Sequence, residues 1–216
     1  MYTLHPSAEL RRHFSERPFQ GAAPWDARFL FVGLDANYAP DIERSPIFPE
    51  LLRYHQDGVD FWRQHRFHHP FLLPGYRGDG RRYHRNFARL GFLPGDAAEV
   101  SFVELLHLPT VGRNSLVVSD LDPSHLRMLD MAMRQGRARH VFVSAGVARL
   151  LRRLPSFGWL RAQPLIGDGL PQLYADGGRC VYQHLHLSNY GKFEARMQRE
   201  AHAVAALRQE ALGSLV

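Results

Sequence analysis

Three apolar runs in this chain are each followed by polar side chains that can carry a charge or transfer a proton. In the first, Asp35 and Asn37 follow the apolar residues 29–32. In the second, Glu104 and His107 end a run that begins at position 100. In the third, four polar residues follow the run that begins at position 179: His184, His186, Ser188 and Asn189. Carboxylates and imidazoles held together can stabilise a developing charge or act as general acid and base.

Apolar runs of this length without alternation are typical of strands that are buried on both faces of a parallel sheet. The carboxyl ends of such strands meet at one edge, where α/β proteins bind ligands. We therefore expect the three stretches to converge on one cleft. Gly33 is expected to turn the backbone sharply where the first strand ends. The alternative is an ordinary strand-to-loop turn, in which Asp35 and Asn37 only satisfy local backbone groups.

The apolar pattern predicts strands that alternate with helices. The strands cover residues 29–34, 100–106, 140–146 and 179–187. The helices cover residues 7–14, 49–67, 81–90, 123–135, 147–154 and 193–212. Residues 68–80 are rich in glycine, proline and aromatic residues and indicate a long surface loop, and residues 165–175 indicate a hairpin or edge strand. Right-handed crossovers between parallel strands then give an α/β fold, a three-layer α/β/α sandwich with a central, mainly parallel sheet of about four strands.

The size and composition of the chain favour one domain over residues 1–216, because 216 residues with 45% hydrophobic content can bury one core. No apolar run approaches the ~20 residues of a membrane span, and residues 1–12 lack the apolar stretch of a secretory signal. Cys180 is the only cysteine, which excludes an internal disulfide framework and favours a reducing cytoplasm. We expect a cytoplasmic monomer that does not bind membranes.

The charge of the chain favours a polyanionic partner. The formal net charge is +6, and Lys192 is the only lysine among the basic residues. The planar guanidinium group of arginine is well suited to bind phosphate. None of the expected helices has a basic face opposite a broad apolar face, as a membrane-surface helix would, so nucleic acid is favoured over a membrane as the partner. The arginines of the expected helix 81–90 either contact phosphates or form a solvated helix face.

Four segments resemble motifs of the uracil-DNA glycosylase superfamily. Gly33-Leu34-Asp35 is similar to the first motif, where a glycine after the first strand is followed two residues later by Asp or Asn. His186-Leu187-Ser188 is similar to the second, a His-Pro-Ser after the last strand. Residues 102–114 resemble the middle strand and its Pro/Gly-rich exit, and residues 141–148 resemble the strand-glycine-helix unit. The order and spacing agree over about residues 28–195.

This resemblance implies a DNA glycosylase that hydrolyses the N-glycosidic bond of a damaged or deaminated base, flipped from DNA, in base-excision repair. Asp35 would stabilise the cationic sugar or orient the attacking water. His186 would hydrogen-bond the base oxygen on which negative charge develops. No cofactor is implied, because an iron–sulfur cluster needs several thiolates and Cys180 is alone.

The resemblance also implies which residues contact the base and the DNA. Gly33, Asn37 and Tyr38 would line the base pocket, and Phe71 or Tyr76 would stack on the base. The family's uracil-reading asparagine would be replaced by Glu104 or His107. The DNA phosphates would be contacted by the loop that contains Ser188, Asn189, Tyr190 and Lys192.

The chain departs from the family pattern at two places, which leaves the excised base open. Leu187 stands where the family has proline, and Ala36-Asn37-Tyr38 replaces Pro-Tyr or Pro-Gly. Two other functions stay open: a catalytically inactive nucleic-acid-binding protein of the same fold, and a nucleoside or nucleotide hydrolase. A metal site built from His184, His186 and the pair at 68–69 is a weaker alternative, because thirteen histidines produce such pairs by chance.

Overall fold

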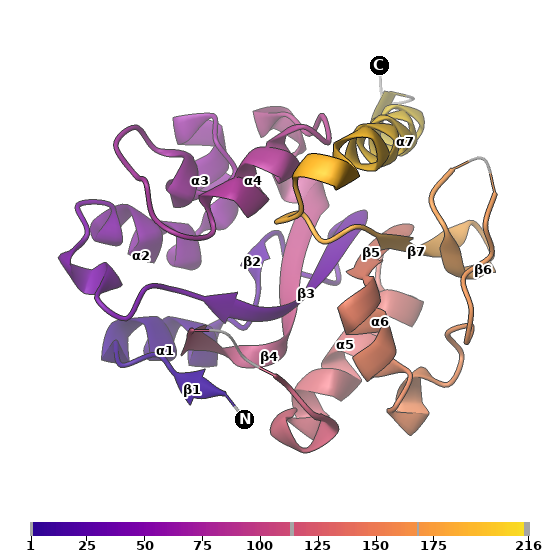
Figure 1. Cartoon of the computed structure of the whole chain (residues 1–216), viewed down its shortest axis with the longest axis horizontal. Coiled ribbons are helices and arrows are strands. Elements are labelled where there is room, and N and C mark those ends of the chain that lie inside the picture. Colours follow the sequence, from indigo (N-terminus) through magenta and orange to yellow (C-terminus); the bar gives the residue numbers. More distant parts are fainter. Residues whose placement is uncertain (1, 113–114, 168, 214–216) are drawn as a thin grey trace.

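The computed structural model of the chain describes residues 2–112, 115–167 and 169–213. Its centre is a mainly parallel sheet of seven strands among these residues, in the order β1-β4-β3-β5-β7-β6, with β2 also paired to β4 (Figure 1). The strands are β1 Thr3–Leu4, β2 Gln20–Gly21, β3 Phe29–Asn37, β4 Val100–Val111, β5 His140–Ser144, β6 Gln172–Asp176 and β7 Arg179–His184. The helices are α1 Ala8–Glu16, α2 Phe48–Gln56, α3 Gly58–His65, α4 Arg81–Ala88, α5 Pro123–Gln135, α6 Ala145–Leu151 and α7 Glu194–Leu212.

The four strands expected from the apolar runs form the parallel centre of the sheet, in the order β4-β3-β5-β7. The predicted number of about four strands is wrong, because β1, β2 and β6 add antiparallel pairings. β1 and β2 have two residues each, too few to carry a periodic pattern. β6 falls in the expected hairpin region and leads into β7 through Gly177 and Gly178, both at positive φ.

Alternation along the central strands separates aromatic from aliphatic side chains. In β3, Phe29 and Phe31 join a cluster of mainly aromatic residues, whereas Leu30 and Val32 join an aliphatic cluster on the other face. Helices α3, α4 and α7 contribute to the aromatic cluster, and α5 and α6 contribute to the aliphatic one. The sheet is therefore flanked by helices on both faces (Figure 1).

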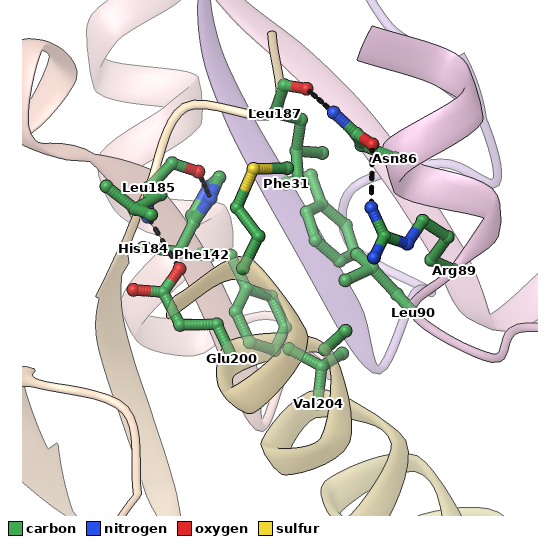
Figure 2. A pocket seen from close by; sticks show the side chains of 12 residues that line it. Phe31, Asn86, Arg89, Leu90, Phe142, His184, Leu185, Leu187, Glu200 and Val204 are labelled. Atoms are coloured by element: carbon green, nitrogen blue, oxygen red, sulfur yellow. Dashed lines mark hydrogen bonds between the residues drawn. The ribbon is translucent and has the colours of Figure 1, made fainter. Parts of the chain in front are cut away.

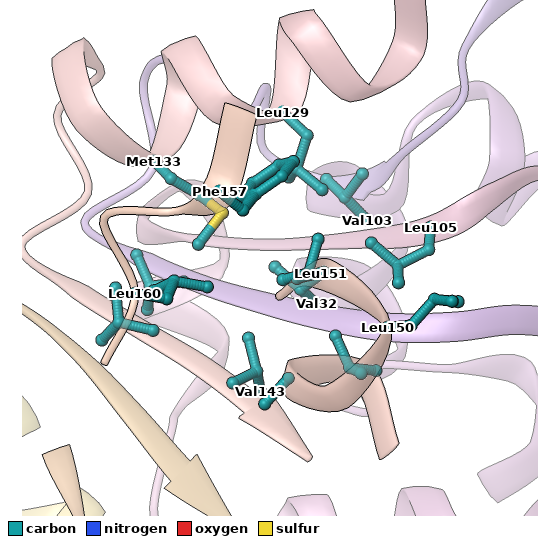
Figure 3. Packing of buried hydrophobic residues seen from close by; sticks show 14 of the residues in the cluster. Val32, Val103, Leu105, Leu129, Met133, Val143, Leu150, Leu151, Phe157 and Leu160 are labelled. Carbon is teal, nitrogen blue, oxygen red and sulfur yellow. The ribbon is translucent and has the colours of Figure 1, made fainter. Parts of the chain in front are cut away.

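The aliphatic face is closely packed. Figure 3 shows Leu129 and Met133 of α5 with Leu150 and Leu151 of α6 around Val32 of β3. All five side chains are buried. Burying one side chain of this kind contributes about 1.5–3 kcal/mol, so this face holds the strands whose carboxyl ends carry the polar residues.

Residues 49–67, predicted as one helix, form two. Asp57 separates α2 from α3 in an extended conformation, and its Oδ1 accepts a 2.9 Å hydrogen bond from the Asp60 N–H. Gly58 lies so close to Gly21 that an added Cβ would be 2.7 Å from the Gly21 nitrogen. The apolar spacing continues across the break, but the aspartate cap and the close approach to Gly21 start a new helix.

Residues 68–80, predicted as a long surface loop, pack against the body of the protein. His68, His69, Phe71 and Tyr76 are all buried. Phe71 stacks on Tyr76 with ring centroids 4.5 Å apart, and His69 Nδ1 accepts a 3.1 Å hydrogen bond from the Phe71 N–H. The ring stack and the hydrogen bond to His69 hold this segment against the protein, although its glycine and proline content is typical of an exposed loop.

The remaining helices lie close to their predicted ranges. Ser7 caps α1, with its Oγ accepting a hydrogen bond from the Leu10 N–H at 3.2 Å. No helix within the described ranges is both long and apolar enough to cross a bilayer. Arg113 and Asn114, which end the stretch 102–114, lie outside the described residues.

Candidate active site

A cleft of about 560 Å³ opens at the carboxyl ends of the parallel strands. This volume suits a small ligand or a single nucleotide unit. Nine of the predicted site residues line it: Gly33, Asp35, Asn37, Tyr38, Phe71, Glu104, His186, Ser188 and Asn189. The three polar stretches therefore converge, as the sheet rule predicts.

Gly33 makes room in the cleft and does not turn the backbone. β3 continues through it to Asn37, with an irregular register between Asp35 and Ala36. Gly33 is paired with Glu104 across the sheet, and an added Cβ would collide with the Glu104 carboxyl group. The predicted sharp turn is wrong. Gly33 instead leaves open the space that the Glu104 carboxyl group occupies, so any larger residue would have to displace that group.

Glu104 is enclosed beside Asp35. Burial disfavours its charged form and the neighbouring Asp35 disfavours a second negative charge, and together they raise the pKa of Glu104 to about 8. Its backbone is held from the other face of the sheet, where His125 Nε2 lies 2.8 Å from the Glu104 carbonyl oxygen. At neutral pH the cleft thus contains a neutral carboxylic acid, which can donate as well as accept a hydrogen bond.

Asp35 is positioned by a chain of hydrogen bonds from the end of β4. Thr110 Oγ1 donates to Asp35 Oδ2 at 2.6 Å. Asn37 Nδ2 donates to Thr110 Oγ1 at 3.3 Å and also to the carbonyl oxygen of Gly112. Thr110 is buried, and its hydroxyl lies closer to Asp35 Oδ2, at 2.6 Å, than to its other acceptor, the Ala36 carbonyl oxygen at 3.5 Å. Asn37 therefore lines the cleft, but its amide N–H groups orient Asp35 through Thr110.

His186 is held in one tautomer by Ser188. The Ser188 backbone N–H donates to His186 Nδ1 at 3.3 Å, and Ser188 Oγ lies 2.6 Å from the same nitrogen. A backbone N–H can only donate, so Nδ1 is the acceptor and a neutral ring carries its proton on Nε2. Desolvation lowers the pKa of His186, and the Asp35 carboxylate opposes that shift. A neutral imidazole with Nε2–H as a donor results.

The segment after β7 is fixed by side chains of α4 and α7 (Figure 2). Asn86 Nδ2 donates to the carbonyl oxygens of Leu187 at 2.5 Å and Asn189 at 3.3 Å. Glu200 Oε2 accepts a hydrogen bond from the Leu185 N–H at 2.7 Å. Leu187 is buried in the aromatic cluster. In place of the proline of the resembled motif, this chain thus uses an apolar anchor and two hydrogen-bonding side chains.

Three predicted site residues do not line the cleft: His107, Lys192 and Tyr190, the last of which lines an adjoining hollow. The ring of His107 packs against His125 of α5, with centroids 5.3 Å apart, on the opposite face of the sheet from Glu104. Lys192 lies in the short helix Gly191–Phe193, with its Nζ 5.3 Å from the centre of the Phe193 ring. The alternative in which His107 reads the base is therefore wrong, because His107 does not face the cleft. The contact of Lys192 with DNA phosphates stays a prediction.

The aromatic residues predicted to contact the base differ in their position relative to the cleft. Phe71 lines the cleft, whereas Tyr76 lies behind it in the stack. Tyr38 also lines the cleft, but its hydroxyl is 3.0 Å from His55 Nε2 and is used there. The aromatic wall is therefore formed by rings fixed in the core.

A second hollow of about 1280 Å³, here called the arginine groove, adjoins the cleft and shares Tyr83, Ser188 and Asn189 with it. Tyr190 is 66% exposed, and the Arg82 guanidinium lies 4.1 Å from the centre of its ring. Five arginines line the groove: Arg77, Arg81, Arg82, Arg85 and Arg89. Arg89 is paired with Glu194, which also lines the groove.

Several cleft residues were not singled out by the sequence. Tyr54, Tyr83 and His84 line the cleft from α2 and α4. His69 of the 68–80 segment lines it as well, and the sequence named this residue only as part of an alternative metal site. Tyr83 is identified by spacing as an inward helix residue, but that signal does not distinguish a core position from a cleft position. Thr110 follows Pro109 at the end of β4, and a hydroxyl at a strand end is the one signal that points to it.

Among the described residues, no group of three or more His, Cys, Asp or Glu side chains is arranged to hold a metal ion. His68 and His69 are instead packed with His84, where His68 Nε2 lies 3.1 Å from His84 Nδ1. A scan against protein-family models finds no match, and a search of curated proteins finds none either. The function is therefore argued from the site.

Proposed function

We propose that this chain is a DNA glycosylase that hydrolyses the N-glycosidic bond of a damaged or deaminated base flipped from DNA, in base-excision repair. The observation that carries the proposal is the cleft shared by Asp35, from β3, and His186, from the segment after β7. A carboxylate and a neutral imidazole that donates through Nε2 are complementary to the two charges that this reaction creates.

The reaction follows from those charges. As the bond from C1′ to the base nitrogen breaks, its electron pair goes to the base and the sugar becomes cationic. Asp35 stabilises that cation and orients the water whose oxygen adds to C1′. The His186 Nε2–H group donates a hydrogen bond to the base oxygen as negative charge develops there. One proton of the water leaves to Asp35 or to solvent, which gives an abasic sugar. The base departs as an anion and takes up a proton from solvent to become the free base.

The arginine groove supports DNA as the substrate in preference to a free nucleoside. Its arginines adjoin the cleft on the side of Ser188 and Asn189, where the phosphates next to a flipped nucleotide would bind. Tyr190, exposed beside Arg82, can occupy the gap that the flipped base leaves. A monomeric state and a cytoplasmic location, expected from the sequence, are part of this proposal.

The test is to incubate the protein with duplexes that contain uracil, hypoxanthine, xanthine or a mismatch, and to score abasic sites. Asp35→Asn and His186→Ala are each expected to lower the excision rate by at least about 100-fold while DNA binding is retained. If both variants cleave like the parent, the proposed site is wrong. If no duplex is cut but DNA is bound, an inactive binding protein is favoured. Turnover of free nucleosides alone favours the nucleoside hydrolase.

A further inference from the structure

We propose that Glu104 binds the edge of the flipped base as a neutral carboxylic acid, and that it selects bases with an adjacent donor and acceptor on that edge. The inference rests on the proposed function and adds the group that determines specificity. It starts from geometry: Glu104 lies across the sheet from Gly33, within the cleft that Asp35 and His186 share.

The Glu104 carboxyl group is available to a ligand. Among the described residues no side chain or backbone group hydrogen-bonds it, although Tyr83 and Tyr38 lie close enough to interact with it electrostatically. The missing Cβ of Gly33 leaves the carboxyl its space. A partly buried carboxyl without a protein partner loses hydrogen bonds that only water or a ligand can replace.

A neutral acid matches a nucleobase edge in a way that a carboxylate does not. Its hydroxyl donates to a base carbonyl oxygen, and its other oxygen accepts the adjacent ring N–H, so two hydrogen bonds form side by side. Uracil, hypoxanthine and xanthine all present this pair. An ionised Glu104 has no donor and would place its charge against the carbonyl oxygen. It would also oppose the negative charge that the departing base acquires.

The same chemistry sets the limit of the selection. Since the hydroxyl can sit on either carboxyl oxygen, the acid can also pair with a ring nitrogen and an amino group. Glu104 therefore requires an edge with adjacent donor and acceptor, and it rejects bases in which methylation blocks that edge. It does not by itself choose between a deaminated base and its amino parent.

The protonation of Glu104 should be visible in the pH profile, because the groups around it do not titrate in the same range. Burial together with Asp35 raises the pKa of Glu104 to about 8. Burial raises the pKa of the facing tyrosines and lowers the pKa of the facing histidines, so both stay neutral near pH 8: Tyr38, Tyr54 and Tyr83, and His69, His84, His184 and His186. Arg196 at the rim is paired with Glu200.

The experiment compares the parent with Glu104→Gln and Glu104→Leu in single-turnover excision from a lesion duplex, between about pH 6.5 and pH 9. The glutamine amide also offers a donor beside an acceptor and does not ionise. We expect Glu104→Gln to stay within about tenfold of the parent near pH 7 and to lose less rate above pH 8 than the parent does. Glu104→Leu should lose about 100-fold or more. Circular dichroism and thermal unfolding verify that both variants fold.

The outcomes separate the two proposals. If the parent cuts no duplex, the proposed function fails and the role of Glu104 fails with it. If the parent cuts but folded Glu104→Gln is as inactive as Glu104→Leu, an ionised carboxylate is needed and only this inference is overturned. Equal pH profiles for the parent and Glu104→Gln also overturn it, as does parent excision of an edge-methylated base at the rate of the unmethylated one.

Discussion

Thr110 Oγ1 donates a 2.6 Å hydrogen bond to Asp35 Oδ2, and this bond joins the ends of two adjacent parallel strands. Asn37 Nδ2 donates to the same hydroxyl, so the hydroxyl proton is directed at the carboxylate. Asp35 is therefore oriented by groups of the protein itself. Preorganisation of this kind is what electrostatic stabilisation of a sugar cation requires.

Replacing Thr110 by valine should lower kcat of the proposed excision by about 10- to 100-fold and leave KM nearly unchanged, because a hydrogen bond to a charged group contributes about 1.5–3 kcal/mol. Single-turnover kinetics at saturating enzyme measure the effect. Thr110→Ser keeps the hydroxyl and should recover most of the rate. If Thr110→Val folds and cleaves like the parent, the hydroxyl does not position Asp35.

Replacing Ser188 by alanine removes the hydroxyl near His186 Nδ1 but keeps the backbone N–H that donates to it. We expect a rate loss of severalfold, smaller than that of His186→Ala, with Nδ1 still unprotonated. Nitrogen NMR of the histidine ring reports the tautomer directly. Ser156→Ala, an exposed serine in the short helix Pro155–Phe157, is the matched control. A proton found on Nδ1 in the parent would contradict the assignment.

Replacing Asn86 by alanine should destabilise the segment after β7. The carbonyl oxygens of Leu187 and Asn189 lose their donor, which costs about 1–3 kcal/mol when the groups are buried. Urea unfolding measures this loss, and excision should fall as His186 becomes less fixed. Asn86→Asp has the same shape but no N–H, so it should be at least as damaging. Equal stability of all three proteins would rule out this anchoring role.

The parallel centre of the sheet was predictable because its strands are continuous apolar runs. Since the carboxyl ends of parallel strands meet at one edge of a sheet, the same pattern predicted that Asp35, Glu104 and His186 lie close together. The two predicted site residues of β4 lie on opposite faces of the strand: Glu104 lines the cleft, whereas His107 packs against His125. Strict alternation does not explain this separation, because Leu105 and Leu106 both join the aliphatic cluster and the pairing of β3 with β4 shifts between Leu106 and Pro109. The spacing of these two residues in the sequence therefore does not exclude His107 from the cleft that contains Glu104.

Other features of the site depend on contacts that no local pattern contains. The role of Gly33 follows from the carboxyl group that lies across the sheet, not from its place after an apolar run. The burial of Phe71 follows from its stack on Tyr76, in a segment whose composition indicates exposure. The support of the segment after β7 by Asn86 joins residues 101 positions apart in the chain. Such long-range polar contacts are visible only in the folded protein.

The unfolding free energy should fall as the pH drops below about 6.5. Burial lowers the pKa of several histidines. Among them are His55 and His84, whose pKa falls to about 3, and His68 and His69, whose pKa falls well below the ordinary value. In the unfolded chain these rings take up protons near pH 6.5, but in the folded protein they do not. Each ring can therefore remove up to about 1.4 kcal/mol per pH unit in acid, and the full stability is present above that pH.

Urea unfolding at several pH values between about 5 and 8 measures this slope. His84→Gln should flatten it, and His55→Gln is a second variant should the first fail to fold. His202→Gln removes an exposed histidine of α7 and should leave the slope unchanged. Slopes that are the same in all folded variants would show that these buried rings are not the source.

The arginine groove predicts a salt-dependent affinity for DNA that depends on particular side chains. Arg82 and Arg85 are exposed on α4 within the groove, and a phosphate contact by either releases counterions when DNA binds. Each alanine variant should weaken binding uniformly across sequences and lower the slope of log affinity against log salt by about 0.9 for each phosphate that is no longer neutralised. Arg149→Ala removes an exposed arginine from α6, over the opposite face of the sheet, and should leave the slope unchanged.

Fluorescence anisotropy at several salt concentrations measures DNA binding by the parent and by the three alanine variants. Equal slopes would mean that the groove arginines are only a solvated helix face.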